Sequence, residues 1–448
     1  MKRSNGATIH EPARELPVYG TCEVLVVGGG PAGTAAAIAA GRAGAETVLA
    51  ERYGYLGGLS TGGLVCWIDR MTDWDGRLVV GGIGKELMDD CGAQEGGLVG
   101  PSPDLWGSHD PEANAFWGAR SAARRGVVTW TPTIDPEILK AVSNDKVRQA
   151  GVQMLLHCWA VGPAMVDGRV GGAIFESKEG RFAVLADVTI DCTGDGDIFA
   201  GAGAPFESDV DSDSIHALVN TACRFGNVDS QTYLDFQIKN PKAYSDLMRQ
   251  ADAAGVSLRC GVMPQNGQSL CMHPKYAGYS ALKVADLTEA ELRSRDAHRT
   301  GLEWFREHMP GWQQAILLET APQIGVRHSR RLAGTTRVTM EHWKGGGRFE
   351  DGVGLCPGMT PQMPTLQIPL GSLLPRHLDG MLVAGRNLSC DATSHNALRE
   401  VPECWVMGEG AGVAAAQAVR QRAAVREVDL AAVQNRLRET GAVVDVPA

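Results

Sequence analysis

CEVLVVGGGPAGTAAAIAAGRAGAETVLAE, residues 22–51, is the stretch of sequence that decides the fold. The apolar run 22–27 predicts a buried strand, the alanine-rich run 31–43 predicts a helix, and 46–51 predicts a second strand. Strands that alternate with helical segments form parallel sheets, because a crossover helix must connect them. We therefore predict an α/β fold built on a parallel sheet.

The turn between the first strand and the helix fits the pattern G-x-G-x-x-G. Gly28 permits the tight turn, Gly30 leaves room for a pyrophosphate, and Gly33 lets the helix pack closely on the sheet. Pro31 suits the first helical turn, where its missing N–H is not needed. This context predicts a Rossmann-type dinucleotide-binding domain rather than a glycine-rich turn without a ligand. The predicted contacts from this turn are Gly28, Gly30, Pro31, Ala32 and Gly33.

Glu51 ends the second strand, near the position about 20 residues beyond the turn where the motif carries an acid. A carboxylate there accepts hydrogen bonds from ribose hydroxyls and repels a 2′-phosphate, an effect that neighbouring Arg52 weakens. The turn alone does not separate NAD from FAD, so an NAD dehydrogenase stays open at this point.

Four later segments carry a resemblance to a known family. ERYGYLGGLSTGG (51–63) resembles the E-x-x-x-x-G-G run of glutathione-reductase-type flavoproteins, in the branch that includes fumarate reductases. DCTGDGD (191–197), IGVRHSRRLAG (324–334) and LVAGR (382–386), with residues 394–397 and 399–412, are similar to segments of the FAD-dependent oxidoreductase family. His328 stands where that family usually has an acid, so a role tied to the acid does not transfer.

The resemblance implies that FAD is the cofactor. The sequence pattern separately predicts a helix from about residue 407 to 422, opened by the glycines of 408–412; either its positive end faces the flavin or its start only packs on the sheet. The contacts that the resemblance adds are Glu51, Arg52, Gly57, Gly58, Leu59, Ser60, Thr61, Thr193, Gly194, Asp195, Gly385, Arg386, Gly410 and Gly412.

Four residues are candidates for the chemistry. His395 lies in a predicted loop before the last helix and is either a base or a hydrogen-bonding partner of FAD or backbone. Arg399 either binds a substrate carboxylate in a bidentate fork or forms a structural ion pair. Arg327 and Arg330 either contact an anionic substrate or serve the structure.

Two domains are predicted for the 448 residues. The FAD-binding domain comprises 20–64, 150–205 and 378–448, and a mixed α+β substrate or cap domain comprises 65–149 and 206–377. Irregular structure is expected over 64–144, a hairpin over 169–184, a short separate strand over 188–191, and helices around 229–254 and 286–308.

Composition excludes several classes of partner. A net charge of −10 argues against nucleic acid, and no apolar run is long and uninterrupted enough to be a membrane span. The eleven cysteines are scattered, without a C-x-x-C pair to support a dithiol mechanism, which favours free thiols in the cytoplasm. The run 209–213 begins like a calcium loop, but Ser214 and Asn220 replace the glycine and the final acid, so no metal site is expected.

The function predicted from these observations is hydride transfer between flavin N5 and a small organic substrate, with a carboxylate-bearing molecule as one option. The alternatives are a flavin monooxygenase and a non-catalytic FAD-binding electron-transfer subunit. A homo-oligomer stays open.

Overall fold

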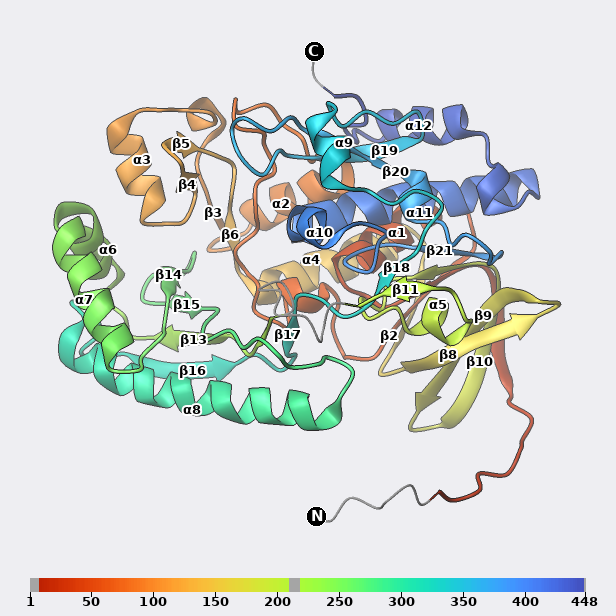
Figure 1. Ribbon diagram of the computed structural model, residues 1–448, viewed down its shortest axis with the longest axis horizontal. Helices are drawn as coiled ribbons and strands as arrows, with labels where there is room; N and C mark the ends of the chain where they lie inside the picture. The colour runs from red at the N-terminus through yellow and green to blue at the C-terminus, as the bar shows by residue number, and fades with distance from the viewer. Residues whose placement is uncertain (1–7, 209–217, 447–448) are drawn as a thin grey trace.

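The computed structural model describes residues 8–208 and 218–446, and its largest sheet, with seven strands, lies on the right-hand side in Figure 1. The order is β7-β2-β1-β10-β9-β8, with β21 also paired to β10. Parallel pairing links β7 (Gln153–Leu156), β2 (Thr47–Glu51), β1 (Val18–Val27), β10 (Gly180–Asp191) and β21 (Met381–Val383). The predicted parallel α/β fold is therefore confirmed.

The expected hairpin forms from β9 (Arg169–Ser177) and the first part of β10, which pair antiparallel. β8 (Trp159–Val166) extends this antiparallel edge. The prediction of a separate strand at 188–191 is wrong, because β10 runs unbroken from the hairpin into the sheet centre. One long strand thus carries the chain to the carboxyl edge of the parallel sheet.

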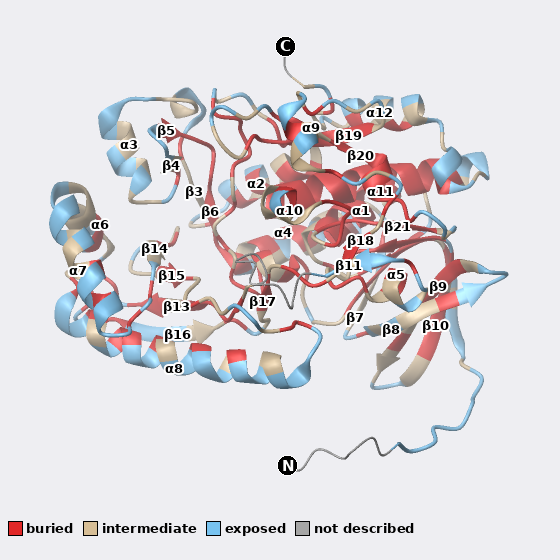
Figure 2. Cartoon of the chain, viewed as in Figure 1, coloured by how far each residue is buried: buried red, intermediate tan, exposed pale blue. Residues whose placement is uncertain are grey.

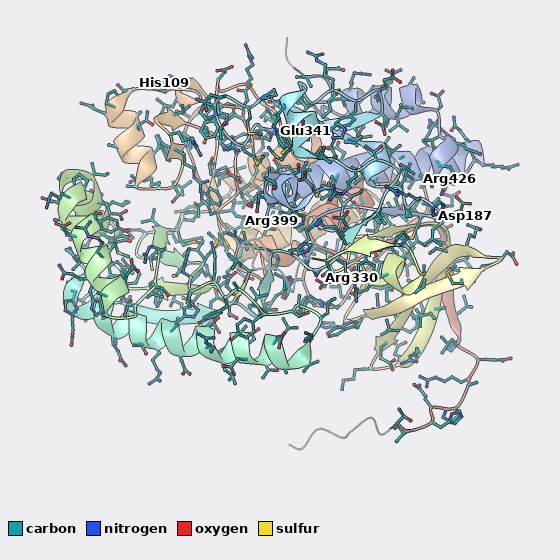
Figure 3. All side chains as sticks on the ribbon, in the orientation of Figure 1. His109, Asp187, Arg330, Glu341, Arg399 and Arg426 are labelled. Carbon is teal, nitrogen blue, oxygen red and sulfur yellow. The ribbon has the colours of Figure 1, made fainter. Side chains whose placement is uncertain are left out.

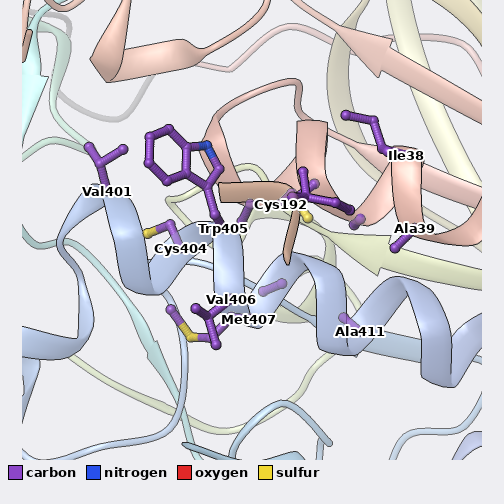
Figure 4. Packing of buried hydrophobic residues seen from close by; sticks show 14 of the residues in the cluster. Ile38, Ala39, Cys192, Val401, Cys404, Trp405, Val406, Met407 and Ala411 are labelled. Carbon is purple, nitrogen blue, oxygen red and sulfur yellow. The ribbon is translucent and has the colours of Figure 1, made fainter. Parts of the chain in front are cut away.

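Two helices rich in small residues form the core beside this sheet. α1 (Pro31–Arg42) packs along α11 (Val401–Gln421), and Figure 4 shows their apolar contact around Ile38, Ala39, Met407 and Ala411. A Cβ on Gly408 would collide with the carbonyl oxygen of Ala32. Glycine and alanine therefore let the two backbones approach closely. Figure 2 shows both helices as mostly buried.

A second sheet lies apart from the first and is antiparallel throughout. Its order is β14 (Cys260–Val262), β15 (Ser269–Cys271), β13 (Cys223–Gly226) and β16 (Ile316–Thr320). Helices α6 (Ser230–Lys239), α7 (Pro241–Ala253) and α8 (Val284–His308) accompany it, which agrees with the helices predicted there. This part has its own core, which contains Trp312 and Phe305.

The prediction of irregular structure over 64–144 is wrong in part. This region contains α2 (Gly82–Gly92), α3 (Pro111–Gly118) and the start of α4 (Pro136–Gln149). The Asp135 side chain caps α4 by accepting hydrogen bonds from the first-turn N–H groups, and Pro136 occupies the first turn. α2 and α4 contact α1 and contribute to its hydrophobic core.

Short elements complete the described chain. The two-stranded pairs are β3 (Leu98–Val99) with β6 (Thr133–Ile134), β4 (Ala123–Arg124) with β5 (Val127–Val128), β11 (Phe206–Glu207) with β18 (Arg331–Leu332), β12 (Val219–Asn220) with β17 (Gly325–Val326), and β19 (Gly352–Cys356) with β20 (Leu366–Pro369). The remaining α-helices are α5 (Asp197–Gly201), α9 (Met340–Lys344), α10 (Ala392–Leu398) and α12 (Leu430–Glu439).

All eleven cysteines are free thiols. Among residues 8–208 and 218–446, no group of histidine, cysteine and acidic side chains is arranged to hold a metal ion. The acidic run 209–213 lies outside the described residues. None of the helices in the described ranges combines the length and the apolar character that crossing a bilayer requires.

Candidate functional site

One large cavity, of about 770 Å³, opens where the carboxyl ends of β1 and β10 meet the second sheet. Pockets for small molecules and cofactors span about 300–1,000 Å³. One wall is the glycine-rich turn after β1, with residues that follow β2, β10 and β21. The opposite wall comes from the second sheet and from chain segments at 323–327 and 396–404.

The glycine-rich turn has the geometry of a phosphate cradle. Gly28 has φ +100°, and a Cβ there would lie 2.5 Å from the carbonyl oxygen of Cys192, so only glycine fits. A Cβ on Gly33 would collide with the Gly28 carbonyl oxygen. Gly30 differs from both, because its φ is −68° and nothing lies within 4 Å of a Cβ built on it. Neither backbone conformation nor protein packing requires glycine at Gly30, so the space beside it fits a ligand.

The N-terminus of α1 faces this open space. Its N-cap, Gly30, offers no side chain to its first-turn N–H groups, and Gly28, Gly30, Pro31 and Ala32 line the cavity. Uncapped N–H groups and the positive end of the helix dipole together attract an anion such as a phosphate. The turn is therefore free to bind a diphosphate.

Glu51 ends β2 at the edge of the cavity and is buried. Its carboxylate accepts hydrogen bonds from the backbone N–H of Gly29 at 2.6 Å and of Tyr53 at 2.8 Å. Burial raises the pKa of Glu51, and these two bonds offset part of the rise. The carboxylate thus fixes the phosphate turn itself while it lines the cavity beside Arg52.

The loop after β2 packs directly against the glycine-rich turn. The N–H of Gly57 donates to the carbonyl oxygen of Gly29 at 2.8 Å. Ser60 and Thr61 turn their hydroxyls inward and donate to the carbonyl oxygens of Gly57 and Leu56. Gly58 and Leu59 line the cavity, whereas Gly57, Ser60 and Thr61 are not among its lining residues.

The segment after β10 forms a polar network with the segment after β21. Arg386 donates to the Asp195 carboxylate at 2.7 Å and to the Ser329 hydroxyl at 3.0 Å. Burial favours the neutral acid, but the charge of Arg386 together with hydrogen bonds from Ser329 and Arg386 outweighs burial and lowers the pKa of Asp195. Thr193, Gly194, Gly385 and Arg386 line the cavity, and Asp195 holds Arg386 from behind.

The glycines of 408–412 do not open a helix. α11 begins at Val401, with Glu400 as N-cap and Pro402 in its first turn, so the expected start near residue 407 is wrong. A Cβ on Gly410 would meet Val353, and one on Gly412 would collide with Ala36. These two glycines serve helix packing and lie outside the cavity lining, while Glu400, Val401 and Cys404 at the true helix start line it.

His395 does not lie in a loop and does not line the cavity. It is part of α10, whose N-terminus is capped by the Asp391 side chain, and it is almost fully buried. One ring nitrogen lies 2.7 Å from the carbonyl oxygen of Arg386. Burial and the neighbouring His328 hold the pKa of His395 well below its usual range. Its geometry matches the backbone-bonding alternative, and it positions Arg386.

The other three predicted catalytic residues separate into two groups. Arg327 and Arg399 line the cavity, whereas Arg330 does not. Arg330 donates to the carbonyl oxygen of Asp195 at 3.0 Å and to the Asp197 carboxylate at 3.1 Å. Figure 3 shows Arg399 near the centre of the molecule and Arg330 closer to the first sheet. Arg330 therefore supports the segment after β10.

Arg327, Arg399 and Lys275 bring three cationic groups to the cavity wall. Arg399 pairs with Glu400 at 2.8 Å. Burial and then the charge of Arg399 lower the pKa of Arg327 to about 10. Burial, with the charges of Arg327 and Arg399, lowers the pKa of Lys275 to about 8. Burial and mutual repulsion together disfavour the charged forms of Arg327 and Lys275, which an anionic ligand in the cavity would stabilise.

Three cavity-lining residues were not predicted from the sequence: Lys275, His273 and Glu400. Burial and the charge of Lys275 lower the pKa of His273 to about 4, while burial raises the pKa of Glu400. Lys275 and His273 follow β15 in a segment without a motif, so no signal pointed to them. Glu400 had one, because Pro402 shortly after it is typical of a helix start.

The family model described as FAD dependent oxidoreductase matches residues 23–437. No curated protein matches the sequence. Among solved structures, a geranylgeranyl bacteriochlorophyll reductase-like protein from Thermoplasma acidophilum is 14% identical, with a TM-score of 0.44, over 94% of this chain and 83% of that one. The myxobacterial chondrochloren halogenase is 12% identical, with a TM-score of 0.47, over 94% of this chain and 78% of that one. Glycine oxidase from Geobacillus kaustophilus is 12% identical, with a TM-score of 0.43, over 90% of this chain and 95% of that one.

Proposed function

Because the chain belongs to the FAD-dependent oxidoreductase family, we propose that it transfers a hydride between N5 of its FAD and a small organic substrate that bears a carboxylate. The observation that carries this proposal is the wall of Arg327, Arg399 and Lys275 opposite the phosphate turn. The family establishes an FAD enzyme, and the cationic wall supports the substrate class.

The residues present fit FAD. The open space beside Gly30 accepts a diphosphate without a clash, and the uncapped start of α1 supplies N–H donors to it. Glu51 lines the cavity at the edge where a ribose would follow. The start of α11, at Val401, brings a second positive helix end to the cavity, where it favours negative charge on a reduced isoalloxazine ring.

When bound, the flavin supplies the centre that accepts or donates the hydride. Arg327 and Arg399 bind the substrate carboxylate, since guanidinium groups pair with carboxylates in a planar, bidentate fork. Glu400 orients Arg399 through their 2.8 Å ion pair. Both arginines lie in a largely buried wall, where charged hydrogen bonds are stronger than in water.

Lys275 handles the proton that accompanies hydride transfer. Its pKa of about 8 makes the neutral amine available near physiological pH, as a general base requires. In the oxidation direction the amine takes a proton from the substrate, and in the reverse direction the ammonium returns it. His273 stays neutral in this range, because its pKa of about 4 lies well below it.

The test is anaerobic mixing of the purified, FAD-loaded protein with a panel of small hydroxy, amino and saturated carboxylic acids. Each acid is paired with its amide, which keeps the shape and removes the charge. Loss of the visible flavin absorbance with an acid, and not with its amide, supports the proposal. Bleaching by amides equally well would overturn the carboxylate assignment. Oxygen uptake that depends on NAD(P)H would favour the monooxygenase alternative.

We also propose a cytoplasmic location. Eleven free cysteines are typical of proteins kept in a reducing compartment.

A further inference from the structure

Three cysteines lie side by side across the second sheet. Cys271 on β15 stands directly opposite Cys260 on β14 and directly opposite Cys223 on β13. Their spacing in the sequence is much wider than that of a C-x-x-C motif, so the strand register is what brings them together.

The register gives a geometry that permits a disulfide. Residues directly opposite in antiparallel strands have Cα atoms about 4.5–5.5 Å apart. Cysteines joined by a disulfide have Cα atoms about 4.4–6.8 Å apart. Cys271 can therefore form a disulfide with either neighbour without a change of strand pairing.

The two neighbours of Cys271 differ in access. Cys223 and Cys271 are fully buried in the core of the second sheet. Cys260 is partly exposed, and it is the member of the three that lines the cavity. A small reagent that enters the cavity thus meets Cys260 first, with Cys271 directly behind it.

We propose that Cys260 and Cys271 form a reversible disulfide when a hydroperoxide enters the cavity, with Cys260 as the attacking thiol and Cys271 as the resolving thiol. This proposal does not depend on the hydride transfer proposed above, because it is argued from the strand register and from the access of Cys260 to the cavity, and it uses none of the three cationic side chains. It adds a thiol redox pair to a chain whose sequence offered no sign of one.

The chemistry balances with hydrogen peroxide as the oxidant. The Cys260 sulfur attacks one peroxide oxygen, the O–O bond breaks, a water leaves, and Cys260 becomes a sulfenic acid. The Cys271 sulfur then attacks the Cys260 sulfur, the S–O bond breaks, the S–S bond forms, and a second water leaves. The two thiol hydrogens end in the two waters. Each sulfur loses one electron, and the peroxide gains both.

The test treats the FAD-loaded protein with hydrogen peroxide, blocks the remaining thiols with N-ethylmaleimide during denaturation, and maps the peptides by mass spectrometry. Trypsin leaves Cys260 and Cys271 in one peptide, 260–275, and cyanogen bromide then cuts after Met263. Fragments 260–263 and 264–272 stay joined if the disulfide has formed, and they separate after dithiothreitol. The thiolate is the nucleophile in both steps, so the cross-link should form faster as pH rises.

Two variants and one control sharpen the result. Cys260→Ala and Cys271→Ala should each abolish the joined fragments. Cys223→Ala is the matched control, since it removes a buried thiol from the other side of Cys271, and it should leave the cross-link intact. Separate fragments in oxidised wild-type protein would overturn the proposal, as would a bond from Cys271 to the tryptic peptide that contains Cys223 in place of Cys260. Both readouts use wild-type protein, so they stand even if a variant does not fold.

Discussion

The two walls of the cavity are built in opposite ways. The wall formed by the glycine-rich turn uses backbone groups and missing side chains, and its key residues follow one another at Gly28, Gly30 and Gly33. The facing wall uses charged side chains, and Lys275, Arg327 and Arg399 come from segments far apart in the sequence. The first wall suits the diphosphate of FAD, whereas the second is the wall to which we assign the proposed carboxylate substrate.

The largest expected effect follows from a substitution in the backbone wall, because this wall should hold the cofactor. Gly30→Val places a side chain in the open space beside the turn, where the protein itself makes no contact within 4 Å. We expect a folded protein that has lost its FAD, because the added methyl groups occupy the place of the diphosphate. The measurement is the ratio of visible flavin absorbance to protein absorbance, together with a circular dichroism spectrum.

Gly92→Val is the matched control for this substitution. Gly92 lies at the end of α2, its φ is not in the positive range, and a Cβ there also meets nothing within 4 Å. This variant should bind FAD like the wild type. Full flavin occupancy in Gly30→Val would show that the phosphate lies elsewhere.

A substitution in the side-chain wall should have the opposite effect: the protein should keep its FAD and lose activity on the substrate. Arg327→Met removes a half-buried charge and keeps most of the side-chain length. A hydrogen bond to a charged group contributes about 1.5–3 kcal/mol. Because about 1.4 kcal/mol corresponds to a factor of ten, we expect kcat/KM for a carboxylate substrate to fall by about 10–100-fold. FAD content should not change.

Arg426→Met is the control for Arg327→Met. Arg426 pairs with Asp379 away from the cavity lining, and Figure 3 shows it well apart from Arg399. Its replacement should leave kcat/KM within about twofold of the wild-type value, since Arg426 is exposed and does not line the cavity, and solvent and salt screen exposed charges. An equal loss of activity in both variants would remove the case for a carboxylate-binding wall.

Lys275 gives a smaller effect that depends on pH. The pKa of Lys275 is lowered to about 8, so the ammonium dominates below pH 8 and the neutral amine above it. If the amine is the base, kcat/KM for substrate oxidation rises with pH through about 8 and then levels off. Lys275→Met should lose this rise and should reduce the plateau by about 10²-fold or more, within the range of general-base catalysis.

Lys85→Met supplies the matched control, because Lys85 forms an exposed ion pair with Asp89 outside the cavity. It should keep the full pH profile. A Lys275→Met enzyme that retains the rise near pH 8 would assign that titration to another group and leave Lys275 as a carboxylate ligand.

The backbone wall could be predicted from the sequence for a physical reason. A strand, a glycine-rich turn and a helix are local, so G-x-G-x-x-G after an apolar run predicts both the element order and the cradle. The predicted fold class, the family and FAD are confirmed. Most predicted cofactor contacts line the cavity or support residues that do.

Errors arose where a glycine or a histidine was assigned by its place near a motif. Gly410 and Gly412 looked like a helix start, although Pro402 gave the better sign of where α11 begins. His395 looked like a loop residue, although Asp391 is a typical N-cap for a short helix. These were readable signals that the motif resemblance outweighed.

Lys275 and the three cysteines of the second sheet had no such signal. Their meeting depends on the register of β13, β14 and β15 and on how that sheet packs, and neither is encoded in a short motif. Antiparallel register is set by the hydrophobic pattern of the paired strands and by turn geometry, and neither was readable from a short motif here. The side chains of the facing wall are therefore the part of the site that sequence patterns alone did not reveal.

Glu409, which joins α11 to the start of α2 and the end of α12, should affect stability and leave the chemistry unchanged. It is buried on α11, and its carboxylate accepts hydrogen bonds from the N–H of Ile83 at 3.0 Å and from the Thr440 hydroxyl at 3.2 Å. Burial raises the pKa of Glu409 from 4.5 to about 7. Between these two pH values the folded protein keeps the proton and the unfolded chain loses it, so this group makes stability fall as pH rises.

Glu409→Gln removes this titration and keeps a polar group of the same size. The amide oxygen can accept the Ile83 N–H, and the amide nitrogen can donate to Thr440. One pKa unit corresponds to 1.36 kcal/mol, so we expect the variant to gain about 1–3 kcal/mol in free energy of unfolding, relative to wild type, between pH 4.5 and pH 7. Urea unfolding of the FAD-loaded proteins at pH 5 and pH 8 measures this gain. A stability difference that is the same at both pH values would mean that Glu409 titrates normally, and kcat/KM should not change in either case, because Glu409 does not line the cavity.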